Sequence, residues 1–284
     1  MHMTTNVEFT NLQKILYPEI GVSKKQVIEY YIRTASKMLD FLQGRPTVMT
    51  RYPEGVGKEG FFEKDAPQGT PSWVKTFKRY SDTAQRHVNY VLCNNIDTLL
   101  WLANLAALEL HITLSKAEHY EKPDLVLLDI DPEPPATFDN AVEVSLLAKE
   151  RVNSVSLDCY VKTSGKKGLH MLIPVEEEYS FQQTREFVHQ IGRHMSKESA
   201  IVVSEFSQSR DPGTVFVDYL QNSHGRTMVC PYSLRATEGA TVSTPLDWND
   251  VRKGLRPEQF TLLSVPKMQK SPWQGLLENR QKLG

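Results

Sequence analysis

The chain has 284 residues, of which 40% are hydrophobic and 24% are charged, a composition that excludes a disordered or fibrous protein and can supply a stable core. Its 33 Lys and Arg against 34 Asp and Glu give a formal net charge of −1, so contact with nucleic acid has to be local. The three cysteines are too far apart for a disulfide framework or a CxxC zinc site. The apolar runs are too short to cross a bilayer and the first residues lack a signal-peptide pattern, which predicts a cytoplasmic location without membrane contact.

Residues 1–120 predict an N-terminal α/β module. Ser23 and Gln26 form a capping-box pattern, and apolar residues then recur at steps of three and four, which predicts a helix over 24–42. The remaining predicted elements are a strand at 46–52, a mostly irregular stretch with short strands at 56–85, a strand at 86–93, a helix at 97–108 and a strand at 110–114.

Residues 121–284 predict a second module. Its expected elements are strand 124–131, helix 137–151, strands 157–162 and 168–175, helix 180–198 and strand 214–219. The order β-α-β-β-α-β is that of ferredoxin-like domains, which RNA-recognition modules share. In that arrangement the first strand lies between the third and the fourth.

Two aspartates stand near the end of the first of these strands, in the sequence Leu-Leu-Asp-Ile-Asp-Pro-Glu-Pro. Residues two apart on a strand share a face, so Asp129 and Asp131 point one way. The strand order brings His170 and Asp218 to the same face. Three carboxylates in one place suit Mg²⁺ or Mn²⁺, as a pair of ions in phosphoryl transfer. Glu133 follows Pro132, where the strand should have ended, so we expect it in the solvated exit.

Other interpretations of these acids remain. The pair at 129 and 131 could simply end a strand, with Asp218 unrelated to it. The hairpin between the second and third strands carries Ser164, Lys167 and Gly168, which suits a polyphosphate cradle of backbone N–H groups and cations. It lacks a P-loop pattern and could equally be an exposed basic hairpin.

Two further groups suit nucleotide or nucleic-acid contacts. Arg235 lies downstream of Asp218 and could bind a triphosphate bidentately, or be an ordinary surface arginine. Phe61 and Phe62 lie between lysines, a pattern found in single-stranded nucleic-acid sites, although adjacent phenylalanines are more often core.

Taken together, these motifs resemble the polymerase domain of bacterial ligase D and its stand-alone archaeal relatives, within the archaeo-eukaryotic primase superfamily. The resemblance spans nearly the whole chain. It rests on Thr10-Asn11-x-x-Lys14-x-Leu16-Tyr17-Pro18, Phe61-Phe62-Glu63-Lys64, Leu128-Asp129-Ile130-Asp131-Pro132, Lys162-Thr163-Ser164-Gly165, Gly168-Leu169-His170, Val215-Phe216-Val217-Asp218-Tyr219, Pro231-Tyr232-Ser233-Leu234-Arg235 and Thr244-Pro245-Leu246-x-Trp248. It implies a mixed α/β, primase-type fold in which a βαββαβ catalytic module packs on the N-terminal module, the two forming one polymerase domain.

The resemblance implies a polymerase that fills gaps and extends 3′ ends in non-homologous end joining, favouring ribonucleotides. The implied cofactor is a pair of Mn²⁺ or Mg²⁺ ions on Asp129, Asp131 and Asp218, which are also the implied catalytic residues. The implied nucleotide-binding residues are Ser164, Lys167, His170, Arg235, Arg51, His111 and Gln221. The implied DNA-binding residues are Asn11, Lys14 and Lys24, at a 5′-phosphate, and Phe61 and Phe62, which stack on bases. Residues 78–86 align with a loop that helps bring DNA ends together, and residues 207–213 with a loop near the active site.

The implied partners are gapped or broken DNA with a 5′-phosphate and NTP or dNTP. Because the sequence carries no KxDG-type ligase motif, we expect a separate DNA ligase, an end-processing nuclease or phosphoesterase, and Ku. One alternative is a stand-alone primase, since the same superfamily and metal site serve de novo priming. The non-enzymatic alternative is a DNA-end-binding module, which would have no need of clustered acids.

Overall fold

The structure is a computed structural model that describes residues 5–81, 84–209, 211–268, 271–273 and 275–283. The chain divides into two compact units. Unit 1 comprises Met1–Thr113, Val229–Ser243 and Phe260–Met268, and unit 2 comprises Leu114–Met228, Thr244–Gln259 and Gln269–Gly284. Two late segments therefore return to unit 1, whereas the sequence predicted a single division near residue 120.

Side-chain caps set where the helices begin. The α-helices in the described residues are α1 (Lys24–Leu42), α2 (Ile96–Asn104), α3 (Phe138–Ser154) and α4 (Phe181–Glu198). Both predicted capping boxes are present, at Ser23 before α1 and at Ser180 before α4. The prediction that α2 reaches residue 108 is wrong: Ala106 has a left-handed φ of 58° and the next strand begins at Ala107, and a left-handed residue ends a helix.

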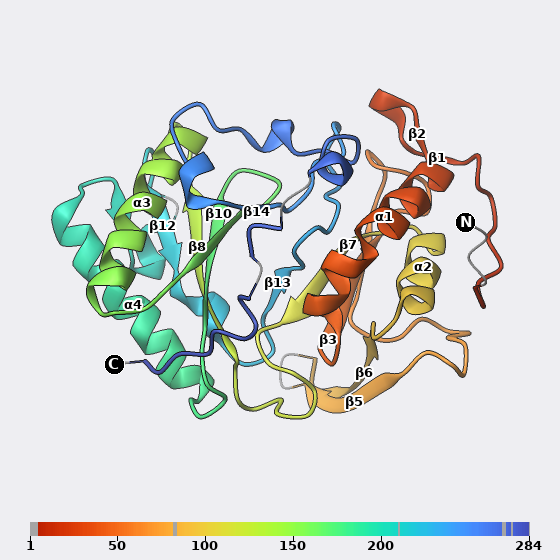
Figure 1. Cartoon of the computed structure of the whole chain (residues 1–284), viewed down its shortest axis with the longest axis horizontal. Helices are drawn as coiled ribbons and strands as arrows, with labels where there is room; N and C mark the ends of the chain where they lie inside the picture. Colours follow the sequence, from red (N-terminus) through yellow and green to blue (C-terminus); the bar gives the residue numbers. More distant parts are fainter. Residues whose placement is uncertain (1–4, 82–83, 210, 269–270, 274, 284) are drawn as a thin grey trace. The chain divides into compact units, whose positions relative to one another are not determined.

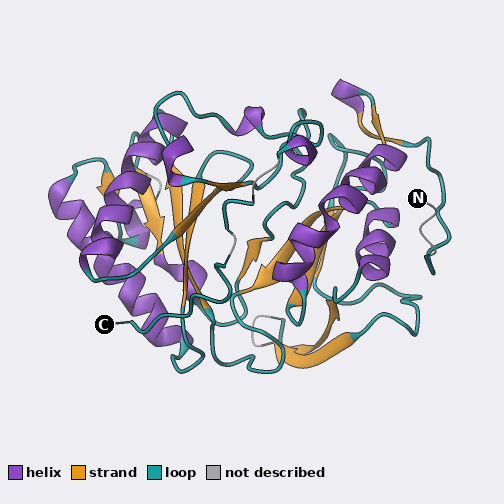
Figure 2. Ribbon diagram, in the orientation of Figure 1, coloured by secondary structure: helices purple, strands orange, loops and turns teal. Residues whose placement is uncertain are grey.

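Unit 1 is built on a sheet in which β7, β3, β6 and β5 follow one another as antiparallel neighbours and β4 pairs with β3, while β13 straddles the division between the two units (Figure 1). The bounds are β3 (Pro46–Arg51), β4 (Phe61–Glu63), β5 (Thr76–Ser81), β6 (Arg86–Leu92), β7 (Ala107–Thr113) and β13 (Thr227–Val229). A short hairpin of β1 (Ile15–Tyr17) and β2 (Val22–Ser23) precedes α1. Helices α1 and α2 pack on each other, and α2 packs on β7 (Figure 2).

Unit 2 contains a sheet with the order β11-β12-β8-β10-β9-β14. The bounds are β8 (Leu125–Pro132), β9 (Tyr160–Thr163), β10 (Leu169–Pro174), β11 (Val202–Val203), β12 (Val215–Asp218) and β14 (Pro245–Leu246). The first long strand, β8, lies between the third and the fourth, β10 and β12, so the ferredoxin-like order is confirmed. The short edge strands β11 and β14 were not predicted, since two residues carry no readable alternation.

Helices α3 and α4 pack on one face of this sheet (Figure 1). The apolar side chains of β8, such as Leu128 and Ile130, are fully buried, and a side chain at Gly192 of α4 would meet Val217 of β12. The alternate residues Asp129 and Asp131 therefore lie on the opposite face. Short 3₁₀-helices occur at Pro18–Ile20, Phe206–Gln208, Tyr219–Asn222, Trp248–Asp250, Pro257–Gln259 and Val265–Lys267.

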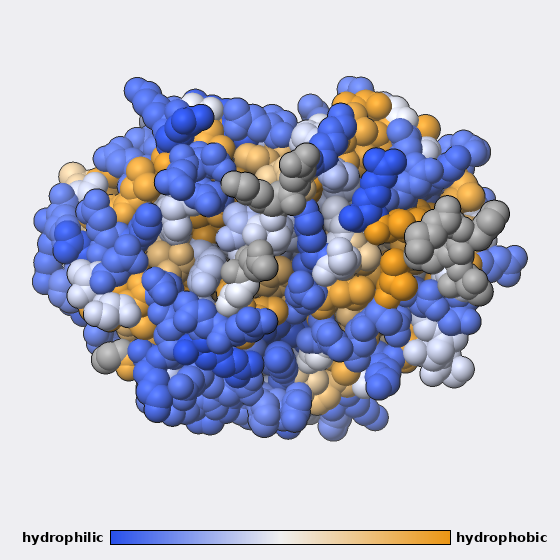
Figure 3. Space-filling view, in the orientation of Figure 1, coloured by the Kyte–Doolittle hydropathy of each residue, from blue (hydrophilic) through white to orange (hydrophobic). Residues whose placement is uncertain are grey.

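The outer surface matches the composition. Much of the face drawn in Figure 3 is hydrophilic, with separate hydrophobic patches. Among the residues that the structure describes, no helix combines the length and the hydropathy needed to cross a membrane. The three cysteines are buried and unbonded to one another.

Candidate active site

The sheet of unit 2 places the predicted acids directly beside one another. Asp129 of β8 is the cross-strand partner of Asp218 on β12 and of His170 on β10, and Asp131 is the partner of Phe216. Antiparallel partners project from the same face with their Cβ atoms about 4.5–5.5 Å apart. The antiparallel register thus groups three carboxylates and one imidazole from three strands.

His170 lies in a buried polar row across three strands. Its Nε2 is 3.3 Å from Asp129 Oδ1, and its Nδ1 accepts a hydrogen bond of 2.9 Å from Lys162 Nζ of β9. Because Nδ1 accepts, the ring proton is on Nε2 and faces the carboxylate. Lys162 is fully buried. Sequence reasoning did not assign it a role, although its place in the Lys-Thr-Ser-Gly motif, opposite His170, was a usable signal.

Lys167 of the hairpin faces the second aspartate. Its Nζ is 3.0 Å from Asp131 Oδ2 and 3.9 Å from Glu133 Oε2. The strand β8 ends at Pro132 as expected, but Glu133 is only partly solvated, because its side chain is 22% exposed. The Glu133 N–H still donates to Thr214 O, so pairing with the neighbouring segment continues past Pro132. Continued pairing keeps the alternation, and Glu133 stays on the side of Asp131.

Burial and mutual repulsion raise the pKa values of two of these aspartates. The pKa of Asp129 is raised to about 7, first by burial and then by the charges of Asp131 and Asp218. The pKa of Asp218 is also raised, chiefly by burial, although hydrogen bonds from Leu220 N and from Gln221 Nε2 oppose the shift. Gln221, predicted to bind nucleotide, thus contacts the carboxylate of Asp218 at 3.1 Å.

The three carboxylates offer the type of donor atom that a hard cation binds. Oxygen donors are what Mg²⁺ and Mn²⁺ prefer, and a cation would relieve the repulsion that raises the two pKa values. The present side-chain arrangement is different, because Asp129 faces His170 and Asp131 faces Lys167. Within the described ranges, no group of three His, Cys, Asp or Glu side chains is gathered closely enough to hold a metal ion. Asp129 and Asp131 would therefore have to turn from these partners to share an ion with Asp218.

The hairpin that carries Lys167 is held closed by Ser164. The Ser164 hydroxyl accepts hydrogen bonds from Lys166 N at 3.2 Å and from Gly168 N at 3.1 Å. Both of these hydrogen bonds lie within the turn itself. Gly168 is required by close packing, because a Cβ there would lie 2.3 Å from Ile130 O and 3.4 Å from Asp131 Oδ1. The glycine lets the hairpin approach β8 beside the acids.

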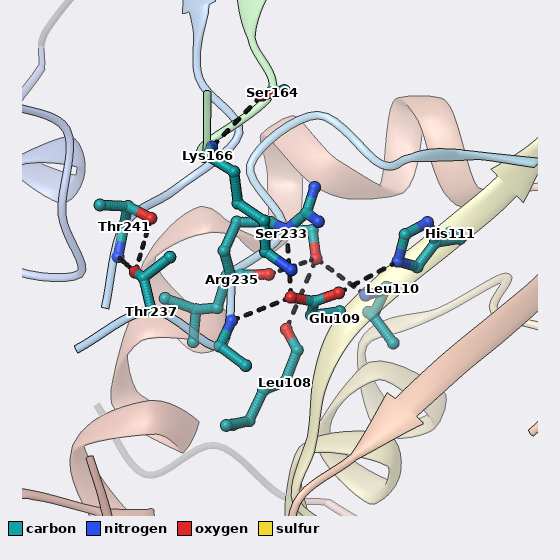
Figure 4. Close-up of polar contacts among 12 residues, drawn as sticks. Leu108, Glu109, Leu110, His111, Ser164, Lys166, Ser233, Arg235, Thr237 and Thr241 are labelled. Atoms are coloured by element: carbon teal, nitrogen blue, oxygen red, sulfur yellow. Dashed lines mark hydrogen bonds and ion pairs between the residues drawn. The ribbon is translucent and has the colours of Figure 1, made fainter. Parts of the chain in front are cut away.

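Unit 1 holds the other predicted nucleotide-binding residues. Arg235 Nε donates to Glu109 Oε1 at 3.2 Å, and His111 Nε2 is 3.4 Å from Glu109 Oε2 (Figure 4). Arg51 lies apart from them on β3 in an ion pair with Glu63 at 3.1 Å and also donates to Leu105 O. No role was assigned to Glu109 from the sequence. The signal available there was an acidic residue within a mostly apolar strand.

The predicted DNA-binding residues form two groups in unit 1. Lys14 N donates to Asn11 O, and Lys24 N donates to Lys14 O, so all three lie around one turn. Lys24 Nζ donates to Thr10 O, and its pKa is lowered by burial and by Lys14. Phe61 and Phe62 of β4 are 50% and 58% exposed, so they are surface residues rather than core.

The two predicted loops are described only in part. Residues 82 and 83 of the stretch 78–86 and residue 210 of the stretch 207–213 lie outside the described residues. The first stretch otherwise comprises the end of β5, a turn at residues 84 and 85, and the first residue of β6. The second stretch begins inside the 3₁₀-helix Phe206–Gln208.

Comparison with known proteins agrees with this fold. Residues 23–273 match the family model described as LigD, primase-polymerase domain. The bifunctional non-homologous end joining protein LigD of Bacillus subtilis is 32% identical over 261 residues, which are 91% of this chain and 42% of that protein. The multifunctional non-homologous end joining protein LigD of Mycolicibacterium smegmatis is 30% identical over 258 residues, 88% of this chain and 33% of the relative.

A solved structure, the polymerase domain from Mycobacterium tuberculosis ligase D in complex with DNA, matches with a TM-score of 0.89 and 26% identity. The match covers 98% of this chain and 100% of that one and confirms the predicted mixed α/β, primase-type fold. The chain spans less than half the length of the curated relatives it matches. Because the family model covers most of the sequence and the fold agrees throughout, the chain belongs to the LigD primase-polymerase domain family.

Proposed function

We propose that this chain is a nucleotidyltransferase that extends DNA 3′ ends and fills gaps during the repair of broken DNA by non-homologous end joining. The observation that carries the proposal is the cross-strand placement of Asp129 against Asp218, with Asp131 on the same face, in a chain of this family. Clustered carboxylates repel phosphate unless a cation accompanies them, so an interface that only bound DNA would gain nothing from them.

The names of similar proteins support the pathway. Those named are non-homologous end joining proteins, and the solved polymerase domain is in complex with DNA. We propose broken or gapped DNA as the substrate of this chain. We also propose that the chain works beside a ligase, an end-processing nuclease or phosphoesterase, and Ku. A preference for ribonucleotides is also part of the proposal.

Within unit 2, the three aspartates, Lys167 and His170 have distinct tasks in this proposal. Asp129, Asp131 and Asp218 would hold Mn²⁺ or Mg²⁺, two ions in all, which supply charge neutralisation at the attacking and leaving oxygens. Lys167, whose Nζ now lies 3.0 Å from Asp131, turns to the phosphates of the incoming nucleotide once that carboxylate is otherwise engaged. His170 presents an N–H toward the same face, oriented by Lys162.

Residues of unit 1 bind the nucleic acid and the nucleotide. Lys14 and Lys24, with Asn11 on the same turn, receive the 5′-phosphate of the strand downstream of a gap. Exposed Phe61 and Phe62 stack on bases, since an aromatic face accepts any base. Arg235, His111 and Arg51 contribute to nucleotide binding.

A primer-extension assay tests the proposal. The substrates are gapped, overhanging and unprimed DNA, each with ribonucleotides or deoxynucleotides and with Mn²⁺ or Mg²⁺. We expect extension on gapped and overhanging DNA and its loss, by at least a hundredfold, in Asp131→Asn, since that carboxylate would hold an ion at the reacting phosphate. Binding of the same variant to 5′-phosphorylated gapped DNA should stay close to wild type.

The matched control is Glu143→Gln, which also removes one carboxylate from unit 2 but on the exposed surface of α3. Full activity of Asp131→Asn would refute the assignment of the acids. Products on unprimed DNA would favour a primase, and DNA binding without extension under every condition would favour an end-binding module.

A further inference from the structure

Unit 1 contains a buried glutamate, Glu109, to which the sequence analysis assigned no role. Glu109 lies in β7 and is 4% exposed. A carboxylate in such a place is costly unless it is paired and hydrogen-bonded. Its Oε1 accepts from Arg235 Nε at 3.2 Å and from Ala236 N at 3.0 Å. This oxygen therefore accepts both from a side chain and from the backbone beside it.

The segment around Arg235 is fixed at several other points. Arg235 N donates to Thr241 O, Tyr17 OH donates to Arg235 O, and Thr237 and Thr241 exchange a hydroxyl hydrogen bond of 2.7 Å (Figure 4). The backbone of Arg235 is thus held independently of Glu109. What Glu109 adds is the orientation of the guanidinium, because it occupies the Nε edge of the planar group.

The second oxygen of Glu109 faces a different nucleotide-binding candidate. Glu109 and His111 are two residues apart on β7, so they share a face of the strand. His111 Nε2 is 3.4 Å from Glu109 Oε2, and Figure 4 shows the carboxylate between the imidazole and the guanidinium. A carboxylate in this position favours a proton on Nε2 and sets the direction of the ring.

We propose that Glu109 is a positioning residue, whose carboxylate holds Arg235 and His111 in the orientation that receives the phosphates of an incoming nucleotide. The inference rests on the proposed function, which assigns both residues to the nucleotide. Arginine binds phosphate through two parallel N–H groups that lie in one plane. An arginine that rotates freely about its side-chain bonds is not held in this geometry and binds the phosphate more weakly.

A purely structural role makes a different prediction. Glu109 would then stabilise unit 1 without affecting the nucleotide, like Ser233, whose hydroxyl accepts from Leu110 N at 2.8 Å in the same cluster. Ser233→Ala is therefore the matched control. It should lower the melting temperature and leave the apparent dissociation constant for nucleotide unchanged.

Binding of fluorescently labelled ATP with Mn²⁺ and steady-state extension of gapped DNA are to be measured for wild type, Glu109→Gln and Glu109→Ala. We expect Glu109→Ala to weaken ATP binding and raise the KM for ATP at least tenfold, with a smaller change in kcat. Its affinity for gapped DNA should stay within twofold of wild type. Glu109→Gln keeps an oxygen acceptor for Arg235 and Ala236 and should fall between the two, which also provides a variant less prone to misfold.

A double-mutant cycle with Arg235→Ala separates positioning from direct effects. If Glu109 acts through Arg235, its replacement should change ATP affinity much less once Arg235 is already absent, leaving only the part that acts through His111. Effects that add fully, or a wild-type KM in a folded Glu109→Gln protein, would overturn the inference. Wild-type ATP binding without extension on any substrate would refute the proposed function instead, and absence of ATP binding in wild type would refute the inference.

Discussion

Asp129 and Asp218 are direct cross-strand partners on β8 and β12, although they lie far apart in the sequence. Like charges opposite one another destabilise a sheet, and burial adds to the cost. The pKa of both carboxyl groups is raised, that of Asp129 to about 7. Keeping these acids together therefore lowers the stability of the folded chain, and a cation bound between them would offset that loss.

The first prediction concerns pH and stability without metal. The pKa of Asp129 is about 7 in the folded protein, against 3.8 for an ordinary aspartate carboxyl group. A raised pKa contributes stability that is complete below about pH 4 and is lost as the pH rises through 7. Asp129→Asn should therefore melt a few degrees above wild type at pH 8 in EDTA, with the difference shrinking towards pH 5. Thermal unfolding followed by circular dichroism measures this.

Glu143→Gln is the control for this pH series, because it removes an exposed carboxylate of the same unit. Its difference from wild type should be small and should not follow the pattern of Asp129→Asn. An Asp129→Asn protein that is less stable than wild type at pH 8 would contradict the account of the buried charge.

The second prediction concerns the glycine beneath the hairpin. A Cβ at Gly168 would lie 2.3 Å from Ile130 O of the strand that carries the acids. Gly168→Ala should push the hairpin away from β8 and lower the free energy of unfolding by about 1–3 kcal/mol. Extension activity should fall with it, because Lys167 and His170 flank this position. Urea unfolding and primer extension provide the two measurements.

Gly239→Ala is the matched control, since a Cβ there would meet nothing within 4 Å and the residue has no left-handed φ. It should change the free energy of unfolding by no more than about 0.5 kcal/mol. Equal behaviour of the two alanine variants would show that β8 and the hairpin are not in the close contact described.

The third prediction concerns Lys14, which we propose to bind the 5′-phosphate of DNA. Lys14 Nζ is paired with Glu54 Oε1 at 2.8 Å, and the Glu54 side chain is 70% exposed. A 5′-phosphate on this lysine has to displace an exposed ion pair that is worth at most about 1 kcal/mol. Glu54→Gln should therefore tighten binding to 5′-phosphorylated gapped DNA by about two- to fivefold at low salt, and less at high salt. Fluorescence anisotropy measures the affinity.

DNA with a 5′-hydroxyl is the comparison substrate for this experiment, and its affinity should not change. Glu29→Gln provides a second control, because Glu29 Oε1 lies 3.9 Å from Lys25 Nζ of the same helix rather than from Lys14. The same gain on phosphorylated and hydroxyl ends would mean that Lys14 contributes only general attraction and no phosphate site.

Local signals made several elements of both units predictable. The capping residues at Ser23 and Ser180 fixed two helix starts, and the alternation through Leu128, Asp129 and Ile130 fixed which side of a strand is polar. Hydrogen bonds between a cap and its own first turn do not depend on the rest of the chain. Element order then implied which strands adjoin, and so the meeting of Asp129 with Asp218.

The features that the sequence did not reveal all depend on partners distant in the chain. The pairing of Glu133 with the segment at Thr214, the burial of Lys162 against His170, and the return of residues 229–243 to unit 1 have no local signature. Glu109 likewise acquires its partners only where Arg235 and Ala236 reach β7. The sequence by itself determined the helices, the strand alternation and the types of functional groups, because these follow from neighbours in the chain. Tertiary structure decided which charges are buried and what each one faces, because burial and pairing are set by residues that only folding brings together.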